Sequence, residues 1–587
     1  MNWIRTSIDA LTRRGVIRAC SIYAGVAWLL IGIADVGLPL IEAPSWVLPA
    51  LIWALLAGLP LTAVLAWFFK SGTGGIELDD ASEPASTRPL RDVVIVSVLL
   101  ALLATSVYLN LTGVPNSDHD LRTIAVLPFR DLSVSGDQTY LAEGVAEELL
   151  NTLARIDELR VVSRNSSFAL GGGKASTAQI ASQLGVGSII EGSVRSLGEV
   201  VRVSVRLIDA ANDTNLWSLT YERGISDLFA LQDEIAADVA RELSVAPRYA
   251  RAFGEVDPQV YPLVLRARHL YRQFTQESLV RAEELLLEAL TLAPDYLAAR
   301  NALAAVYSTQ VGEGFTNPTE GLQKARAALQ QIIDDDPRNA EALAGLGWLS
   351  LRYDNDLPVA ADYLERSLAL AGGTADVLGT ASGLLFRLRR MEEAIAIAKR
   401  VTLLDPLSAF AHANLGIYQL YAGDQPAAIT AYEDALELSP RFVGARYAIG
   451  LAETLRGNHE AALASMILEE DAEFRTKGTA IAQWAAGDKA AFQTALEHLI
   501  AEWGDIWPSE VAEVYAFSGK IDQAFAWIER DIKGSGGTGW AEAVLNPLYE
   551  PLHDDPRWAE LLNRLDLAPE QLAKIQFNMP ATLLQTD

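Results

Sequence analysis

Long runs without charged residues recur three times near the start of the chain. The first begins after Arg18, reaches Asp35 and continues weakly to Ile41. A helix needs roughly 20 apolar residues to cross the hydrocarbon layer of a membrane. No small-residue cleavage site follows the first run, so we interpret it as an uncleaved helix and not as a signal peptide. We expect three transmembrane helices, at about residues 17–40, 46–69 and 93–113.

Basic residues on the flanks of these runs predict their orientation. Four arginines precede the first run, the stretch 37–45 has no Lys or Arg, and Lys70, Arg88 and Arg91 follow the second run. Because loops rich in Lys and Arg stay in the cytoplasm, we expect the N-terminus and the loop after the second run on the cytoplasmic side. Three crossings then place everything after Gly113 on the other side of the membrane.

Between residues 123 and 243 the pattern changes to short apolar strands and amphipathic helices. The run Thr123–Phe129 predicts a buried strand, and the apolar positions of Tyr140–Arg155 recur with helical spacing. Alternating, β-branched runs separated by turn residues predict a meander of three strands further on. The remaining expected elements are a strand at 159–163, a helix at 175–184, strands at 188–197, 200–209 and 216–222, and a helix from Asp227 to about Leu243. This order predicts an α/β domain.

The residues of this domain carry a resemblance to a known family. The segments TIAVLPFRDLS, YLAEGVAEELLNTLARIDELRVVSRNSSFAL and IIEGSVRSLGEVVRVSVRLIDAANDTNLWSLTYERGISDLFALQDEIA are similar to the TolB-like amino-terminal domain of bacterial membrane proteins. LTRRGVIRACSIYAGVAWLLIGIAD and PSWVLPALIWALLAGLPLTAVLAWFF resemble the membrane segment of the same group. The resemblance implies tetratricopeptide repeats after this domain, an inner-membrane location and a soluble body in the periplasm.

Some relatives in this group carry an adenylate cyclase domain or a winged-helix DNA-binding domain ahead of the membrane segment. This chain has only about 15 residues before its first apolar run. We therefore expect neither cyclase activity nor DNA binding from such a domain.

Prolines end several apolar helical runs in the second half of the chain. Pro294, Pro337, Pro406 and Pro440 each end such a run, and the last two lie 34 residues apart. Thirty-four residues is the period of the tetratricopeptide repeat, a helical hairpin. In the unit that matches best, small residues let the two helices approach and an aromatic ring fills the gap between them. Its packing residues are Leu415, Gly416, Ala428, Tyr432, Ala435 and Pro440.

The predicted boundaries follow from these patterns. The membrane head covers 1–114, the TolB-like domain 115–246 and the repeats 247–470. Residues 471–587 are expected to hold degenerate helical repeats and a C-terminal cap, because a solenoid needs a polar end. The predicted fold class is multi-domain: three N-terminal transmembrane helices, an α/β TolB-like domain, and then an all-α tetratricopeptide-repeat solenoid.

Composition limits the chemistry. The net charge is −28, which argues against nucleic acid as a partner, and Cys20 is the single cysteine, which excludes a Cys-based zinc cluster. The stretch Gly171–Ser176 lacks the residues that a phosphate loop needs at two positions. Gly534–Gly539 follows a helix and opens no dinucleotide-binding unit. The six histidines are scattered. We predict no enzyme, no cofactor and no metal site.

These observations favour a membrane-anchored extracytoplasmic scaffold or adaptor that binds proteins or peptides in the groove of the solenoid. The groove-lining candidates on the first helices of their repeats are Phe386, Arg387, Tyr421 and Tyr447, which could equally pack between repeats. An open groove would let Arg387 attract an acidic ligand. The membrane head would also help to pair protomers, which leaves a homo-oligomer open.

Two alternatives remain open from the sequence. The first is a sensory or regulatory subunit that passes an extracytoplasmic signal through the spans to a separate cytoplasmic effector. The second is an enzyme with a site between the TolB-like domain and the solenoid. Its clustered polar candidates are Arg164, Asn165 and Ser166.

Overall fold

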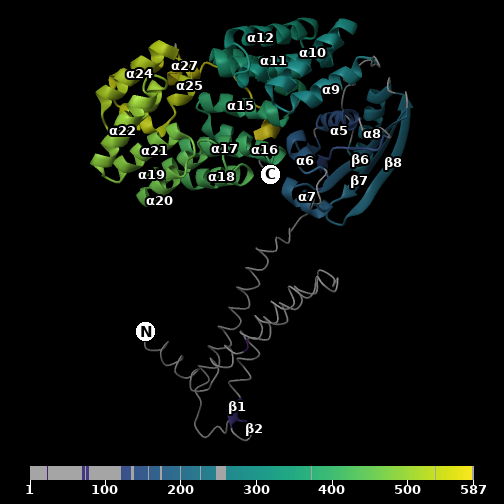
Figure 1. Cartoon of the computed structure of the whole chain (residues 1–587), viewed down its shortest axis with the longest axis horizontal. Coiled ribbons are helices and arrows are strands. Elements are labelled where there is room, and N and C mark those ends of the chain that lie inside the picture. Colours follow the sequence, from purple (N-terminus) through teal and green to yellow (C-terminus); the bar gives the residue numbers. More distant parts are fainter. Residues whose placement is uncertain are drawn as a thin grey trace. The chain divides into compact units, whose positions relative to one another are not determined.

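The chain falls into two compact units, Met1–Asp118 and His119–Asp587. The computed structural model describes Tyr23, residues 69–72 and 75–78, and residues 120–584 apart from 134–137, 157, 172–174, 198–199, 225–226, 246–258, 372, 536 and 538. In the first unit, β1 (Phe69–Gly72) and β2 (Gly75–Leu78) pair as an antiparallel hairpin. The second unit holds the other described helices and strands, apart from the single helical residue Tyr23 (Figure 1).

The expected membrane head requires a correction. The three transmembrane helices predicted at 17–40, 46–69 and 93–113 lie almost wholly outside the described residues. Among the described residues, no helix combines the length and the apolar character that a membrane crossing requires. The fold class with three N-terminal transmembrane helices is therefore contradicted. The described fold is a mixed sheet within residues 123–224, followed by an all-α solenoid.

The sheet has the strand order β5-β3-β6-β7-β8, with β4 paired to β6. The first strands run parallel, and β6, β7 and β8 form an antiparallel meander, as their alternating residues predict. The strands are β3 (Thr123–Val126), β4 (Arg130–Asp131), β5 (Arg160–Val161), β6 (Ser188–Leu197), β7 (Val200–Asp209) and β8 (Thr214–Gly224). Its helices are α5 (Thr139–Leu153), α6 (Arg164–Ala169), α7 (Thr177–Leu184) and α8 (Leu228–Glu242).

The pleat of the strands divides the apolar residues between the two faces of the sheet. Ile124 and Val126 belong to the larger cluster, which α5 and α8 cover. Ala125 and Leu127 point the other way, into a smaller cluster with Leu184 of α7. Apolar burial on both faces explains why β3 is a continuous apolar run and does not alternate.

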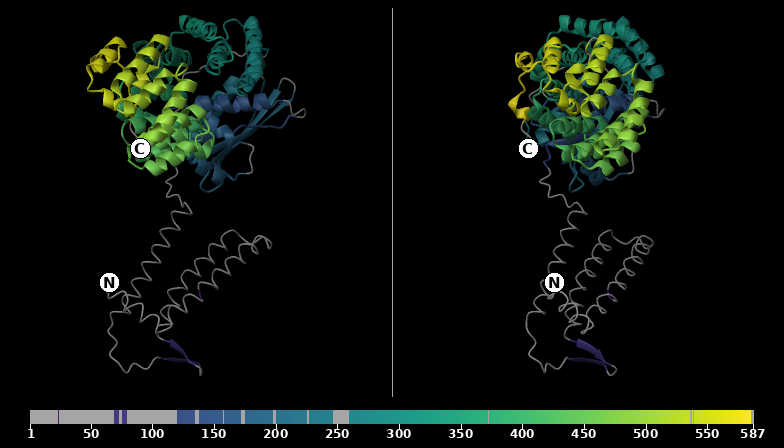
Figure 2. Two further views of the ribbon diagram at one scale, coloured as in Figure 1. Left: turned by 60° about the vertical axis from the view of Figure 1, so that its left-hand side comes forward. Right: turned by 90° about the vertical axis from the view of Figure 1, so that its left-hand side faces the viewer.

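Residues 261–535 form a stack of helical hairpins, which Figure 2 shows from two further sides. We call the first helix of each hairpin helix A and the second helix B. The A/B pairs are α9 (Tyr261–Tyr271) and α10 (Gln276–Leu292), α11 (Leu297–Gly312) and α12 (Pro318–Asp335), α13 (Ala340–Leu349) and α14 (Leu357–Ala371), α15 (Ala375–Arg387) and α16 (Met391–Leu404), α17 (Ala409–Tyr421) and α18 (Gln425–Leu438), α19 (Ala445–Leu455) and α20 (His459–Ile467), α21 (Ala472–Ala485) and α22 (Lys489–Trp503), and α23 (Pro508–Phe517) and α24 (Ile521–Ser535). A π-helical turn, η2 (Ser350–Asp354), extends α13.

The turns between helix A and helix B have a recurring local cause. Gly423 and Gly487 adopt φ values of +86° and +80°, which residues with a side chain rarely do. The next residues, Asp424 and Asp488, accept hydrogen bonds from backbone N–H groups three residues on and so cap the following helices. A Gly-Asp pair therefore ends one helix and starts the next.

Short elements complete the chain after the last hairpin. They are α25 (Trp540–Ala543), the 3-10 helix η3 (Pro547–Leu552), α26 (Pro556–Arg564), α27 (Pro569–Leu572) and α28 (Ala581–Leu584). These elements fold back onto earlier repeats, since α28 contacts α16, and η3 contacts α23. The yellow part of Figure 1 accordingly lies beside green helices that come from the middle of the sequence.

Candidate functional site

The best-matching repeat packs through a close approach of α17 and α18. A Cβ atom on Gly416 would lie 2.8 Å from the ring of Tyr432, which is closer than such atoms pack. Ala428 and Ala435 are fully buried, and the side chain of Leu415 is 9% exposed. Pro440 follows α18, which ends at Leu438. Small residues and one ring therefore occupy the contact.

The four groove candidates are not exposed on an open wall. Phe386 is 2% exposed and its ring lies 4.7 Å from that of Tyr418 and 5.5 Å from that of Tyr421. Tyr447 is buried against Phe474, with 5.3 Å between ring centroids. The expectation of an open groove at these residues is therefore corrected, because other parts of the same chain fill it.

Arg387 is held by two partners within the chain. Its guanidinium donates to the carbonyl oxygen of Leu351 and lies 3.4 Å from the Glu542 carboxylate. Its side chain is only 12% exposed. The arginine predicted to attract an acidic ligand thus binds an acidic residue of its own chain, 155 positions further on.

The first helices of successive hairpins form one face of the solenoid, which we call the helix-A wall. The segment Trp540–Leu552 covers this wall. Tyr549 is fully buried and Trp540 is 1% exposed, both in the cluster that contains Phe386. Leu548 is fully buried in a second cluster, with apolar residues from α17, α19, α21 and α23. The Trp540 indole N–H donates to Asp531 at 2.8 Å, and the Tyr549 hydroxyl donates to the Ser509 carbonyl oxygen at 3.3 Å. We call Trp540–Leu552 the wall segment.

A buried lysine lies on the same wall. Lys477 of α21 contacts the carboxylates of Glu510 and Glu513 of α23, and its ammonium group lies 4.6 Å from the centroid of the Tyr447 ring. Burial raises the pKa of Glu513, although the charge of Lys477 acts in the opposite direction. Burial also raises the pKa of Glu473 to about 7, assisted by the charge of Glu510. Lys477 therefore lies among three carboxyl groups on this part of the wall.

Arg164 and Ser166, candidates for an enzyme site, have structural partners. Arg164 lies 3.1 Å from Glu147, and the Ser166 hydroxyl donates to Asp405 at 2.6 Å. The hydroxyl of Ser163 donates to the same carboxylate. Asn165 lies beside them on α6. The structure thus brings these polar residues together at the junction of the α/β part and the solenoid, where they join α6 to the turn after α16.

Three arginines and three glutamates extend this junction. Arg272, directly after α9, pairs with Glu147, and Arg268 of α9 pairs with Glu148, which is 4% exposed. Burial alone would raise the pKa of Glu147, but the charges of Arg272, Arg268 and Arg164 outweigh it and hold this pKa below its ordinary value. His269 contacts Glu143 at 3.1 Å. No local sequence pattern marks this network, because the partners of its Arg268–Glu148 and Arg272–Glu147 pairs are more than 100 residues apart.

Exposed apolar side chains gather on one edge of the solenoid. The turns from helix B to the next helix A all lie on that edge in a stack of hairpins. Phe410 is 72% exposed and contacts the ring of Phe442 at 5.0 Å between centroids. We call the following set the apolar edge: Phe410, Leu438, Phe442, Val443, Ile467 and Leu468.

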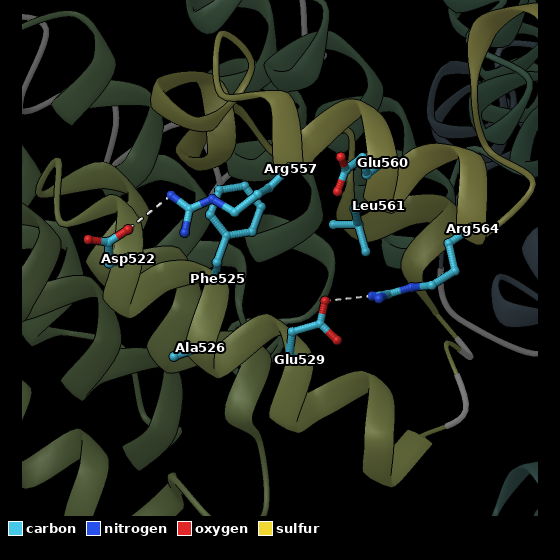
Figure 3. A pocket seen from close by; sticks show the side chains of 8 residues that line it. All are labelled: Asp522, Phe525, Ala526, Glu529, Arg557, Glu560, Leu561 and Arg564. Carbon is cyan, nitrogen blue, oxygen red and sulfur yellow. Dashed lines mark hydrogen bonds and ion pairs between the residues drawn. The ribbon is translucent and has the colours of Figure 1, made fainter.

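A groove lies between α24 and α26, at the surface (Figure 3). Its volume is about 510 Å³, and Phe525 and Leu561 form its apolar floor. Figure 3 shows the two ion pairs at its rim, Arg557 with Asp522 at 3.0 Å and Arg564 with Glu529 at 2.7 Å. Ala526 and Glu560 complete the lining. Because both guanidinium groups already have carboxylate partners, the groove offers no unpaired cation.

Metal and phosphate chemistry finds no support in the described residues. Within 120–584 and the other described positions, no three His, Cys, Asp or Glu side chains are grouped to hold a metal ion. Lys174 of the phosphate-loop look-alike lies outside the described residues. Gly539 precedes the short helix α25, and the element directly before it is the helix α24, whereas a dinucleotide-binding loop follows a strand.

Several solved structures are similar to part of this chain. PilF of Pseudomonas aeruginosa is 18% identical, with a TM-score of 0.29, over 34% of this chain and 90% of that one. A tetratricopeptide repeat protein of Parabacteroides merdae is 18% identical, with a TM-score of 0.27, over 50% of this chain and 99% of that one.

Two curated relatives match by sequence. A Rhizobium meliloti protein named "Putative adenylate cyclase 3" is 32% identical over 237 residues, which are 39% of this chain and 40% of that protein. The transcriptional regulator HilA of Salmonella typhimurium is 26% identical over 195 residues, which are 33% of this chain and 32% of that protein. The chain therefore spans well under half the length of the curated relatives that it matches.

A family model places the repeats in the sequence. The tetratricopeptide repeat model matches residues 320–373 and 414–472. These ranges contain most of α12 with α13 and α14, and most of α17 with α18, α19 and α20, which are helical hairpins of the stack. The hairpins within these two ranges are therefore tetratricopeptide repeats.

Proposed function

We propose that this chain is a protein-interaction scaffold whose tetratricopeptide solenoid holds partner proteins. The observation that carries the proposal is the wall segment. The helix-A wall already binds a non-repeat stretch of polypeptide, using buried aromatic side chains and the Arg387–Glu542 ion pair. A wall that recognises side chains in this way is the binding mode that repeat solenoids offer to peptides.

Occupation of the wall by the chain itself changes where partners are expected. Tyr549 and Leu548 are completely buried, so a partner peptide reaches the same positions only by displacing the wall segment. A partner can bind surfaces outside the wall without displacing the wall segment. The proposed scaffold therefore presents its exposed edges and not its groove.

The α/β part supplies the second module of the proposed scaffold. We assign it to the TolB-like group because the segments of resemblance coincide with β3, α5, α6 and the β6–β8 meander. Buried ion pairs join α5 to α9, so this module has a fixed place relative to the first repeats. An adaptor role outside the cytoplasm, in the periplasm, is part of the proposal and rests on the resemblance of the α/β part to the TolB-like domain of bacterial membrane proteins.

The names of the relatives do not extend this function. One relative is named as an adenylate cyclase and another as a transcriptional regulator, and each is matched over less than half of its length. Two different activities in partial matches fit a shared binding module better than a shared catalytic site. We therefore propose a binding protein and not an enzyme.

Crosslinking in intact cells tests the proposal. A photoreactive amino acid is placed at exposed solenoid positions, and at Ser218 on the sheet as a control, in the full chain. The scaffold predicts discrete crosslinked proteins from solenoid positions, identified by mass spectrometry, and none that are shared with the control. If no solenoid position gives a specific product, the scaffold function is wrong. A reporter active only outside the cytoplasm, fused at the C-terminus, tests the location.

A further inference from the structure

The two long edges of the solenoid differ in chemistry. In the hairpins from α17 to α24, the turns from helix A to helix B carry glycine followed by a polar residue, as at Gly423-Asp424, Gly457-Asn458 and Gly487-Asp488. The opposite turns carry the apolar edge, where Val443 is 57% exposed, Ile467 57% and Leu468 60%. Single exposed apolar residues are ordinary, but a contiguous patch on one edge marks an interaction surface.

The apolar edge is contiguous along consecutive repeats. The Phe410–Phe442 ring contact joins the start of α17 to the turn after α18. Arg441, next to Phe442, lies 3.4 Å from Glu470, in the turn that follows Ile467 and Leu468. These two side-chain contacts connect the start of α17 and the two following turns into one surface.

The same edge already makes an interface one turn earlier. The turn between α16 and α17 contacts the α/β part, where Leu404 accepts a hydrogen bond from the Ser163 backbone N–H and Leu407 packs on the cluster that contains Leu184. The apolar edge begins at Phe410, directly after this interface. It therefore continues a surface through which the solenoid packs against the α/β part of the same chain.

The charges beside the apolar edge select the partner. Glu433, Glu437 and Glu470 are exposed. Two arginines lie close to them: Arg441 is 3.4 Å from Glu470, and Arg475 donates to the carbonyl oxygens of Glu469 and Glu470. A surface with this excess of carboxylates attracts cations and repels anionic lipid and acidic proteins. A second copy of the chain is disfavoured too, since each copy carries a net charge of −28.

From these observations we infer that the apolar edge docks a basic segment of a partner protein that carries apolar side chains. The apolar side chains of that segment bury Val443, Ile467 and their neighbours, and its Lys or Arg residues face Glu437 and Glu470. This inference rests on the proposed scaffold function and names the surface and the chemistry of its partner.

Defined peptides test the inference on the full chain. The probe is a fluorescent 14-residue peptide of leucine and lysine, and its counterpart replaces lysine by glutamate. We expect the basic peptide to bind, with an affinity that falls as salt rises, because its attraction is partly electrostatic. The acidic peptide should not bind. Equal binding of both peptides, or no binding of the basic one, overturns the inference.

Paired variants place the binding on the edge. Val443→Ser with Ile467→Ser should weaken binding about tenfold, since two apolar contacts are lost. Val280→Ser with Leu287→Ser is the matched control, because these side chains on α10 are 46% and 45% exposed but lie elsewhere. Glu437→Gln with Glu470→Gln should weaken binding and flatten its salt dependence. An edge variant that binds like the control overturns the inference.

Two further outcomes separate this inference from the scaffold function. Sedimentation equilibrium that shows a dimer, abolished by Val443→Ser with Ile467→Ser, would assign the edge to self-association and overturn the inference. Crosslinking in cells that captures partners at other solenoid positions but not at position 443 would also overturn it, while the scaffold function stands. The inference is supported if a photoreactive amino acid at position 443 crosslinks to a partner peptide with basic and apolar residues and one at position 459, on the opposite edge, does not.

Discussion

The contact between α17 and the ring of Tyr432 requires glycine at position 416. The ring of Tyr432 occupies the place that a side chain on residue 416 would need, at 2.8 Å from an ideal Cβ. Gly416→Leu therefore forces the two helices apart, and we expect a loss of about 1–3 kcal/mol or more in the free energy of unfolding. Coupling between neighbouring repeats spreads the effect beyond α17 and α18.

Denaturant unfolding of the variant measures this loss. Gly379→Leu is the control, because no atom outside its own helix lies within 4 Å of an ideal Cβ at that position. We expect its stability to stay near that of the parent chain. Similar losses for both variants would mean that the Gly416–Tyr432 approach does not determine the packing.

A second residue-scale prediction concerns pH. Burial, with the Glu510 charge, raises the pKa of Glu473 to about 7 from its ordinary value of 4.5. The folded chain therefore holds a proton that the unfolded chain releases between these values, so stability falls as pH rises from about 5 to 8. Because this carboxyl is partly exposed, solvent screening limits the effect to about 1–2 kcal/mol.

Glu473→Gln should flatten this part of the pH dependence. The measurement is the midpoint of urea unfolding at pH 5, 6, 7 and 8 for the parent and the variant. Glu513, whose pKa burial also raises, contributes with the same sign and remains in the variant. An unchanged slope between pH 5 and 8 would show that Glu473 does not hold a proton in the folded chain.

At the scale of elements, the wall segment decides what the groove can do. Arg387 lies on α15, and its partners are a carbonyl of the preceding π-helical turn and Glu542 of α25. Arg387→Glu would leave the Leu351 carbonyl without its donor and place two carboxylates together. We expect a loss of roughly 2–4 kcal/mol, since unsatisfied buried groups cost about 1–3 kcal/mol and like charges add to this.

Thermal unfolding and a charge-swapped pair test this role. Glu542→Arg combined with Arg387→Glu should recover part of the loss, because the ion pair is restored with reversed sign. Glu542→Gln alone should cost under about 1 kcal/mol, since this carboxylate is 44% exposed. A stable Arg387→Glu chain would instead indicate an open groove.

Local patterns predicted the elements well and the groove poorly. The alternation of residues 188–209 predicts β6 and β7 with the bounds that the structure has, and the 34-residue spacing predicts the hairpin that ends at Leu438. Period and alternation are properties of neighbouring residues. The burial of Phe386 and Arg387 depends on Trp540 and Glu542, about 155 positions away, which no periodicity connects to α15.

At the scale of the whole second unit, buried ion pairs join two structural classes. The α/β part and the solenoid meet through α5 and α9, where the Arg268–Glu148 pair is largely buried, with side chains 19% and 5% exposed. A buried pair that loses one member leaves an uncompensated charge, which costs about 3–5 kcal/mol. The polar cluster of Arg164 to Ser166 was visible in the sequence, but its partners on α5 and after α16 were not, so its structural role could not be predicted.

This junction predicts that the α/β part and the solenoid unfold together. Arg268→Met should uncouple the unfolding of the two parts. Glu148 of α5 then lacks its cationic partner on α9, which weakens the α5–α9 contact. Hydrogen exchange should show α5 and β6 opening at a lower denaturant concentration than α17 and α18, whereas in the parent chain they open together. Arg268→Met combined with Glu148→Met should restore common opening, since an apolar pair can replace a buried ion pair at little cost. Common opening in the single variant would mean that the other junction contacts suffice, namely the Arg272–Glu147 pair and the Ser163 and Ser166 bonds to Asp405. Asp405→Ala would then test whether those bonds hold the two parts together.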